Sequence, residues 1–329
     1  MTIRGIPTAV LLAPDAFKGT FTAVAVAAAI ARGVRSAGRG VDLCPVADGG
    51  EGTAAALSAS LGLQTYTADT EDPLGRPLTA SLALGDGVAA IDVAAASGLG
   101  LVAGRDRDAF AASTAGTGRL ILAAAALGAR TIYLGAGGSA TTDGGAGAVG
   151  AIAAGGGLRG AELIVLCDVR TPFEDAARVF GPQKGASPDD VRRLNARLGA
   201  QARRLERDPR GRPMTGAAGG LAGGLWAALD ARLVAGAGFV LDAVGFDARM
   251  RAARAVVTGE GRLDQQSLAG KVVSEVATRA RQGGVPCHAI VGSRELDAFG
   301  ARMLDLESVL EASTEAELER AGRLIAESL

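Results

Sequence analysis

The stretch Thr131-Ile-Tyr-Leu-Gly-Ala-Gly-Gly-Ser-Ala-Thr-Thr-Asp-Gly-Gly-Ala-Gly147 decides the fold of this chain. Its first four residues are an apolar run of strand length, and the rest, from Gly137 onward, is a cluster of glycines, hydroxyls and one carboxylate. Glycine lets the backbone approach a ligand closely and adopt positive φ. The hydroxyls of Ser139, Thr141 and Thr142 stand beside amides that the start of a helix leaves unpaired. The stretch therefore predicts a strand that ends in a binding loop for an anion such as phosphate.

Strands and helices alternate on both sides of this loop. Near the N-terminus, apolar runs of strand length at 8–13 and 41–46 are each followed by a helical segment, at 22–37 and 52–61. The same alternation returns from about residue 254 to the C-terminus. A strand that is followed by a helix and then by another strand is typical of a parallel sheet.

The middle of the chain has a different pattern. Between 65 and 93, short strand-like segments are separated by Pro73, Gly75 and Gly85-Asp-Gly87, which predicts antiparallel hairpins. We therefore expect an α/β protein with one parallel-sheet domain built from both chain ends and a second α/β domain inserted in it. Ligands of such sheets bind beyond the carboxyl ends of the strands, and pockets favour domain interfaces. The active site is expected in the cleft between the two domains.

Composition excludes several classes of function. The 329 residues are 48% hydrophobic but only 3% aromatic, which is unlike a protein that stacks nucleic-acid bases on aromatic rings. The net charge of −1 provides no overall field toward nucleic acid or anionic membrane. Three scattered cysteines, Cys44, Cys167 and Cys287, form no CxxC pair and predict reduced, buried thiols. Because no signal peptide or membrane span is evident, we expect a cytosolic protein.

Several familiar catalytic motifs are missing from the sequence. No GxxxxGK[ST] run is present, and Gly155-Gly-Gly-Leu-Arg-Gly160 follows a predicted helix, which is the reverse of the dinucleotide-binding order. The only histidine, His288, lies in an apolar run and is predicted to be a core residue. A nucleophilic triad and a histidine metal site are therefore poorly supported.

Charged loops follow several of the other predicted strands. Each of these loops is explicable alone as a solvated turn. Four of them repeat a pairing of glycine with acid or base: Asp15-Ala-Phe-Lys-Gly-Thr20, Asp48-Gly-Gly-Glu-Gly-Thr53, Phe180-Gly-Pro-Gln-Lys-Gly-Ala186, and Thr258-Gly-Glu-Gly-Arg-Leu-Asp264 with Lys271 after it. The fifth, Cys167-Asp-Val169, ends a predicted strand with a carboxylate. Carboxylates, cations, hydroxyls and backbone amides are the groups that phosphoryl transfer needs, since its catalysis is mainly positioning and charge neutralisation with Mg²⁺.

The segments 13–19, 45–53, 180–186 and 258–264, taken together with the 137–147 stretch, closely resemble the bacterial glycerate kinase family of type 1, and the match runs from residue 13 to about 292. The resemblance implies ATP-dependent phosphorylation of D-glycerate with ATP and Mg²⁺ as cofactors. It also implies a Rossmann-like domain, here 1–64 with 237–329, and a flavodoxin-like or mixed α/β domain, here 65–236. The family is usually associated with 2-phosphoglycerate, while 3-phosphoglycerate also occurs among glycerate kinases.

The chain departs from the family in a few places. Asp92 stands where Glu is usual, and Ala115 replaces a larger residue before Gly-Thr-Gly. The segment 150–161 is shorter than usual, and the C-terminal region is abbreviated. These changes leave the kinase chemistry intact but put the choice of substrate in doubt.

We expect the ATP phosphates to bind the loop through Gly137, Gly138, Ser139, Thr141 and Thr142, with Lys184 as a nearby cation. For the remaining roles the sequence leaves alternatives open. The expected substrate-binding residues are Asp15, Lys18, Glu51, Arg262 and Lys271. The expected catalytic residues are Lys18, Asp48, Asp168 and Asp264; any of the three aspartates would accept the hydroxyl proton or orient Mg²⁺, and Asp168 and Asp264 are the candidate metal ligands. The loop is expected to meet Lys18 and Asp264 across the cleft, with domain closure during catalysis.

Other functions fit the same residues less well. A kinase of hydroxypyruvate, tartronate or another small hydroxy acid is the nearest alternative, followed by a non-catalytic metabolite sensor and a dehydrogenase. The intact acids and lysines argue against a sensor, and the reversed GxGxxG order argues against a dehydrogenase. The expected partner is a small molecule rather than nucleic acid or membrane. The oligomeric state is open, with a homodimer among the candidates.

Overall fold

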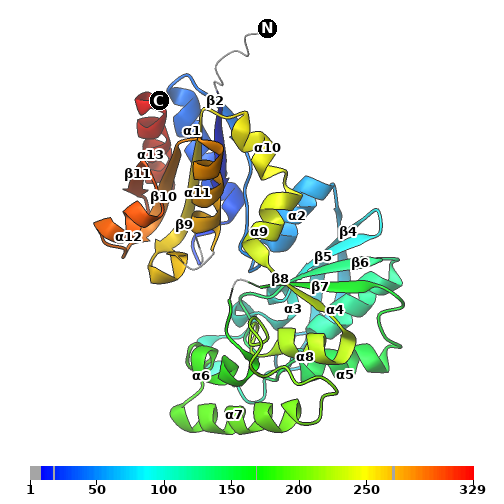
Figure 1. Cartoon of the computed structure of the whole chain (residues 1–329). Coiled ribbons are helices and arrows are strands. Elements are labelled where there is room, and N and C mark those ends of the chain that lie inside the picture. The colour runs from blue at the N-terminus through cyan, green and yellow to red at the C-terminus, as the bar shows by residue number, and fades with distance from the viewer. Residues whose placement is uncertain (1–8, 18, 168, 269–270) are drawn as a thin grey trace. The chain divides into compact units, whose positions relative to one another are not determined.

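The structure, a computed structural model, describes residues 9–17, 19–167, 169–268 and 271–329 (Figure 1). Lys18 and Asp168, two of the predicted catalytic residues, lie outside the described residues. The chain forms two compact units, which we call the terminal unit (Met1–Asp48 with Ala237–Leu329) and the central unit (Gly49–Gly236). Both are α/β, as the sequence predicts.

The terminal unit contains a parallel sheet built from both ends of the chain, so that blue and orange-to-red strands lie side by side in Figure 1. Its strands are β1 (Ala9–Pro14), β2 (Gly40–Leu43), β9 (Ala255–Leu263), β10 (Cys287–Arg294) and β11 (Ser308–Glu311). Their order is β11-β10-β9-β1-β2, and every pairing is parallel. In chain order this reads 2-1-3-4-5, the order of flavodoxin among doubly wound sheets.

Helices cover both faces of this sheet. On one face, α1 (Ala23–Ser36) and α13 (Glu315–Ser328) pack against each other and on the strands. Gly33 permits their close approach, because a Cβ there would lie 1.8 Å from the carbonyl oxygen of Glu319. On the other face, α11 (Val272–Gly283) packs Val273 against Val291 of β10. Three shorter helices complete the unit: α9 (Gly236–Ala243), α10 (Phe246–Arg251) and α12 (Ala298–Met303).

The central unit contains a mixed sheet in the order β3-β4-β5-β6-β7-β8. These strands are β3 (Gln64–Glu71), β4 (Pro77–Gly85), β5 (Val88–Asp92), β6 (Thr131–Gly135), β7 (Glu162–Cys167) and β8 (Arg232–Ala235). The antiparallel pairs β3–β4 and β4–β5 confirm the predicted hairpins, and β5 to β8 are parallel. β8, a four-residue edge strand, was not predicted from the sequence.

The helices of the central unit are α2 (Thr53–Leu61), α3 (Ala94–Ser97), α4 (Ala115–Ala126), α5 (Ala146–Ala154), α6 (Ala176–Phe180), α7 (Pro188–Ala202) and α8 (Leu221–Leu229). α2 packs on β4, β5 and β6. Residues 49–64, placed in the terminal domain on the sequence, therefore group with the central unit in the structure.

Residues predicted to be structural are buried as expected. All three cysteines are buried, and His288 lies in β10 with Nδ1 2.8 Å from the hydroxyl of Ser308. Burial lowers the pKa of His288. Across the described parts of the chain, no helix has the length and apolar character needed to span a membrane.

Candidate functional site

The terminal sheet opens at the carboxyl ends of β1 and β9. Their last paired residues are Pro14 and Gly259, and the Asp15 amide then donates to the carbonyl oxygen of Gly259 (2.8 Å). The β1 chain leaves the sheet there, while β9 continues to Leu263 beside β10. The strand order reverses between β1 and β9, which is where open α/β sheets bind ligands.

The course of β9 corrects one detail of the sequence prediction. The strand was expected to end near Thr258, with the following glycine, acid and arginine in a loop. Instead, pairing with β10 continues as far as Leu263 opposite Arg294, because the ladder supplies hydrogen bonds to the glycine-rich segment. The charged side chains of this segment are therefore presented from a strand.

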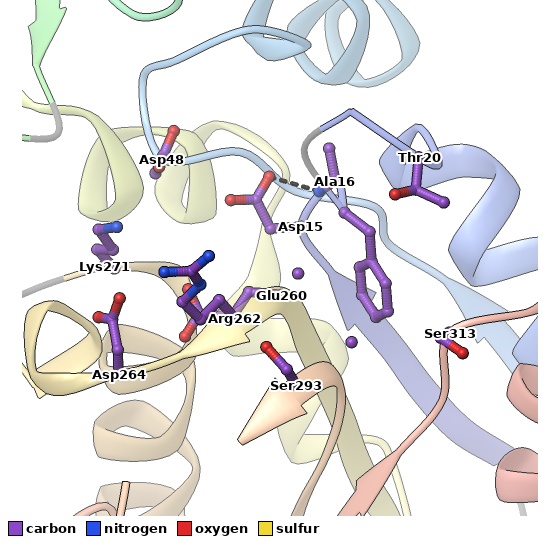
Figure 2. Close-up of a pocket in the computed structure, with 13 residues that line it drawn as sticks. Asp15, Ala16, Thr20, Asp48, Glu260, Arg262, Asp264, Lys271, Ser293 and Ser313 are labelled. Carbon is purple, nitrogen blue, oxygen red and sulfur yellow. Dashed lines mark hydrogen bonds between the residues drawn. The ribbon is translucent and has the colours of Figure 1, made fainter. Parts of the chain in front are cut away.

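A pocket of about 420 Å³ lies at this edge of the terminal sheet (Figure 2). It brings together five of the predicted site residues, and its lining residues are Asp15, Ala16, Phe17, Thr20, Asp48, Glu260, Gly261, Arg262, Asp264, Lys271, Gly292, Ser293 and Ser313. Four carboxyl groups and two cations line it, which makes the pocket strongly polar. Glu260, Thr20, Ser293 and Ser313 were not predicted as site residues, although Glu260 stands between two glycines of a motif that the sequence analysis singled out.

The pocket carboxylates differ in burial. Asp15 and Asp48 are 4% and 2% exposed, whereas Asp264 is half-buried. Oδ1 of Asp15 accepts from the amide of Ala16 (2.7 Å), a bond drawn in Figure 2. Arg262 is exposed, and its Nε lies 3.5 Å from Oε1 of Glu295. Lys271 precedes the first residue of α11.

Glu260 is a buried carboxyl group of the pocket whose pKa is raised. It is 7% exposed, and this burial raises its pKa to about 7. A hydrogen bond from Ser267 and the charge of Lys271 oppose the rise, whereas Asp264 and Asp48 add to it. A carboxyl group with a pKa near 7 is typical of active sites.

The glycine-rich stretch lies in the central unit and follows β6, as predicted. Gly137 packs against Gly50 so closely that a Cβ on Gly137 would lie 2.4 Å from the Gly50 Cα. Gly138 is exposed, has a φ of +66°, and lies beside the carboxylate of Glu51. The predicted substrate residue Glu51 thus lies next to the predicted phosphate loop.

Asp92 holds the chain segment that carries Glu51. Its carboxylate accepts from the amides of Gly52 (2.8 Å) and Ala54 (2.9 Å), which lie at the start of α2. Burial raises the pKa of Asp92 to about 6, against the effect of these two bonds, and the charge of Glu51 adds to the rise. From the sequence, Asp92 was noted only as a departure from the family, in which Glu is usual at this position, and its contact with α2 was not predicted.

Lys184 holds the glycine-rich loop from the inside. Its side chain is 2% exposed, and Nζ donates to Oγ of Ser139 (2.9 Å) and to the carbonyl oxygen of Thr141 (2.6 Å). Burial lowers the pKa of Lys184 to about 7, while the charge of Asp143 opposes that fall. The structure therefore brings Lys184 to the predicted loop, with its ammonium group bonded to the protein.

The loop hydroxyls are buried as well. Thr141 and Thr142 are fully buried, and their Oγ1 atoms have no hydrogen-bond partner among the described residues. The members of the predicted phosphate site that solvent reaches are the backbone at Gly137 and Gly138. The three hydroxyls face the interior of the unit.

Two residues that the sequence analysis did not assign complete the loop. The Asp143 carboxylate accepts from Thr114 Oγ1 (2.8 Å) and from the amides of Gly145 and Gly147 (3.1 Å each). Arg197 of α7 donates from Nη2 to the Thr142 carbonyl oxygen (2.8 Å). Asp143 was visible inside the opening stretch, but nothing in the sequence connects Arg197 to it.

Comparisons with known proteins identify the family of this chain. Residues 10–157 and 154–327 match the glycerate kinase family. The chain is 40% identical to a glycerate kinase of Halalkalibacterium halodurans, over 86% of this chain and 85% of that one. It is 37% identical to the glycerate 2-kinase of Escherichia coli K12, over 93% and 90%. A crystal structure of a protein assigned as glycerate kinase 2 from Salmonella typhimurium LT2 has a TM-score of 0.81, 33% identity and 98% coverage of both chains. The chain belongs to the glycerate kinase family.

Proposed function

We propose that this chain transfers the γ-phosphoryl group of ATP to a hydroxyl group of D-glycerate. The observation that carries the proposal is the polar pocket at the carboxyl edge of the terminal sheet, where cations and carboxyl groups converge at the reversal of strand order. The family and its curated relatives supply the class of reaction.

In this proposal the pocket binds glycerate. Arg262 and Lys271 attract the glycerate carboxylate or the phosphoryl group, since both line the pocket as cations. Lys18 belongs to the same proposed set. The buried carboxylates of Asp15 and Asp48 are placed to accept hydrogen bonds from the glycerate hydroxyls.

The ATP phosphates are proposed to bind the glycine-rich loop of the central unit. The backbone at the half-buried Gly137 and the exposed Gly138 would offer amides to phosphate oxygens, since glycine has no side chain to cover them. We assign Ser139, Thr141, Thr142 and Lys184 a supporting role. Lys184 fixes the loop from within by donating to the Ser139 hydroxyl and the Thr141 carbonyl oxygen, and the side chains of Thr141 and Thr142 are buried beneath it.

Mg²⁺ is part of the proposal, as the ion that neutralises charge on the transferred phosphates. Within the described ranges, no three His, Cys, Asp or Glu side chains are placed to hold a metal ion by themselves. Mg²⁺ in kinases is usually bound by one or two carboxylates together with phosphates and water, so the pocket carboxylates suit it. Asp48, Asp168 and Asp264 stay our candidates for that role.

The product is proposed to be 2-phosphoglycerate, supported by the name of the E. coli relative, glycerate 2-kinase. The test is the purified chain with ATP, Mg²⁺ and D-glycerate, with ADP formation followed by a coupled assay and the product identified by phosphorus NMR. We expect ADP formation and the NMR signal of the 2-phosphate. A signal from the 3-phosphate would correct the position of transfer.

Parallel reactions with hydroxypyruvate and tartronate serve as the comparison. If kcat/KM for either of these acids were higher than kcat/KM for glycerate, that acid would replace glycerate as the proposed substrate. Absence of ADP formation with all three acids would contradict a kinase of small hydroxy acids.

A further inference from the structure

The position of Glu260 is set by the sheet. The residue lies in β9 opposite Val291 of β10, between Gly259 and Gly261. A Cβ on Gly259 would lie 2.1 Å from the carbonyl oxygen of Ile290, so the neighbouring strand packs directly on this backbone. A side chain carried on such a strand is held more firmly than one carried on a loop.

One carboxyl oxygen of Glu260 has no hydrogen-bond partner in the described parts of the protein. This oxygen, Oε1, is buried. The residue lines the pocket in which we place glycerate. A buried polar atom without a partner is costly unless a ligand or water satisfies it. Neither Asp15 nor Asp48, the other buried carboxyls of the pocket, has such an atom among the described residues.

We infer that Glu260 is the residue that accepts the proton of the glycerate hydroxyl during phosphoryl transfer. This inference rests on the function proposed above and deepens it. The hydroxyl oxygen forms the new bond to the γ-phosphorus, the bond between that phosphorus and the bridging oxygen of ADP breaks, and the hydroxyl proton moves to the carboxylate of Glu260. All atoms and charges are then accounted for without a further reactant.

The surroundings of Glu260 support this role. The groups that share the pocket with it are the cations Arg262 and Lys271 and the carboxyls of Asp15, Asp48 and Asp264. Burial, reinforced by Asp264 and Asp48, raises the pKa of Glu260 to about 7. A proton acceptor works best when its pKa lies near the working pH, so this environment suits a general base.

The test is the Glu260→Gln variant, which keeps the size of the side chain and removes its ability to take the proton. We expect kcat to fall about 100-fold or more. The KM values for glycerate and ATP, and the Mg²⁺ concentration at half-maximal rate, are expected to stay within about threefold, because a base acts on the chemical step rather than on binding. Glu311→Gln is the matched control: this carboxylate is exposed on β11 of the same sheet, and its loss should leave kcat unchanged.

A second variant, Glu260→Asp, keeps the carboxyl group and shortens its reach by one methylene. We expect it to recover part of the lost kcat, which also tests the inference if the glutamine variant fails to fold. A kcat equal to that of the wild type in Glu260→Gln, or in a folded Glu260→Ala variant, would overturn the role of Glu260 as proton acceptor. So would a loss that appears as a raised KM for glycerate or a raised Mg²⁺ requirement, because Glu260 would then bind substrate or metal. An active wild type with an active Glu260→Gln variant overturns this inference alone, whereas an inactive wild type overturns the proposed function with it.

Discussion

Lys184 carries an ammonium group that the folded chain makes unusually easy to deprotonate. Burial lowers its pKa to about 7, whereas the ordinary pKa of lysine is about 10.4. Between these values the unfolded chain holds a proton that the folded chain lacks, so this residue makes the free energy of unfolding rise with pH. Below about pH 7 the buried Lys184 ammonium is charged in the folded chain, so its burial lowers the free energy of unfolding by its full amount.

We therefore expect the stability difference between the wild type and Lys184→Met to change in favour of the wild type as pH rises from about 7 to 10. The measurement is urea unfolding at several pH values, followed by the fluorescence of Trp226, the single tryptophan, which lies in α8 of the same unit. Other titrating groups are common to both chains and cancel in the difference. A difference that stays constant from pH 6 to 10 would show that the Lys184 ammonium keeps its ordinary pKa.

The lysines also show what the sequence could reveal of the site. The chain has 34 basic residues, and only Lys18, Lys184 and Lys271 are lysines. All three stand in loops that the sequence analysis selected. The direction of the Lys184 side chain could not be predicted, because it depends on Ser139 and Thr141, more than 40 residues away in the chain. The sequence therefore identified Lys184 as a candidate cation of the site, but its burial follows from tertiary packing and could not be predicted.

At the scale of elements, the existence of strands was easier to predict than their ends. The apolar run at 254–258 identified β9, but its second half, Gly259–Leu263, is glycine-rich and charged and does not have the pattern of a strand. That half is a strand because β10 extends beside it, and pairing between distant segments leaves no local signal. The same reason explains why the short edge strand β8 was missed.

The start of α2 depends on a side chain from a different element. Asp92, at the end of β5, accepts from the Gly52 and Ala54 amides, which the helix itself leaves unpaired. We expect Asp92→Ala to lower the free energy of unfolding by about 1 to 2 kcal/mol, as the loss of other helix caps does. Hydrogen exchange should show faster exchange at these two amides.

The control for this prediction is Glu206→Ala, an exposed carboxylate of the same unit that should change stability by less than about 0.5 kcal/mol. Equal stability of Asp92→Ala and the control, with unchanged exchange at Gly52 and Ala54, would contradict the capping role.

At the scale of the whole molecule, the sequence predicted two α/β units and the insertion of one in the other. The first boundary lies at residue 48 in the structure rather than at 64. The strand–helix alternation continues smoothly through 41–61, so the pattern itself contains no break. The assignment of α2 to the central unit is decided by the sheet on which its side chains pack, which local periodicity does not encode.

The two units also divide the proposed binding work, and this division is open to a kinetic test. The pocket of the terminal unit is assigned to glycerate and the loop of the central unit to ATP. Lys271→Ala removes a cation from the pocket, so we expect the KM for glycerate to rise about tenfold or more, while the KM for ATP stays within about twofold. Arg281→Ala, an exposed cation on the same helix, is the control and should change neither value.

The reciprocal change is Gly138→Ala in the central unit. Gly138 has a φ of +66°, a conformation that costs an alanine about 1 kcal/mol, so relief of this strain should displace the exposed amides of the loop. We expect the KM for ATP to rise with little change in the KM for glycerate.

Gly128→Ala is the matched control, since Gly128 also has a positive φ of +94° but follows α4 in open space. Alanine is disfavoured at Gly128 as well, but this position is not part of the loop, so both KM values should stay at the wild-type level. If Lys271→Ala and Gly138→Ala instead raised both KM values equally, each substrate would depend on both units and the division would be wrong.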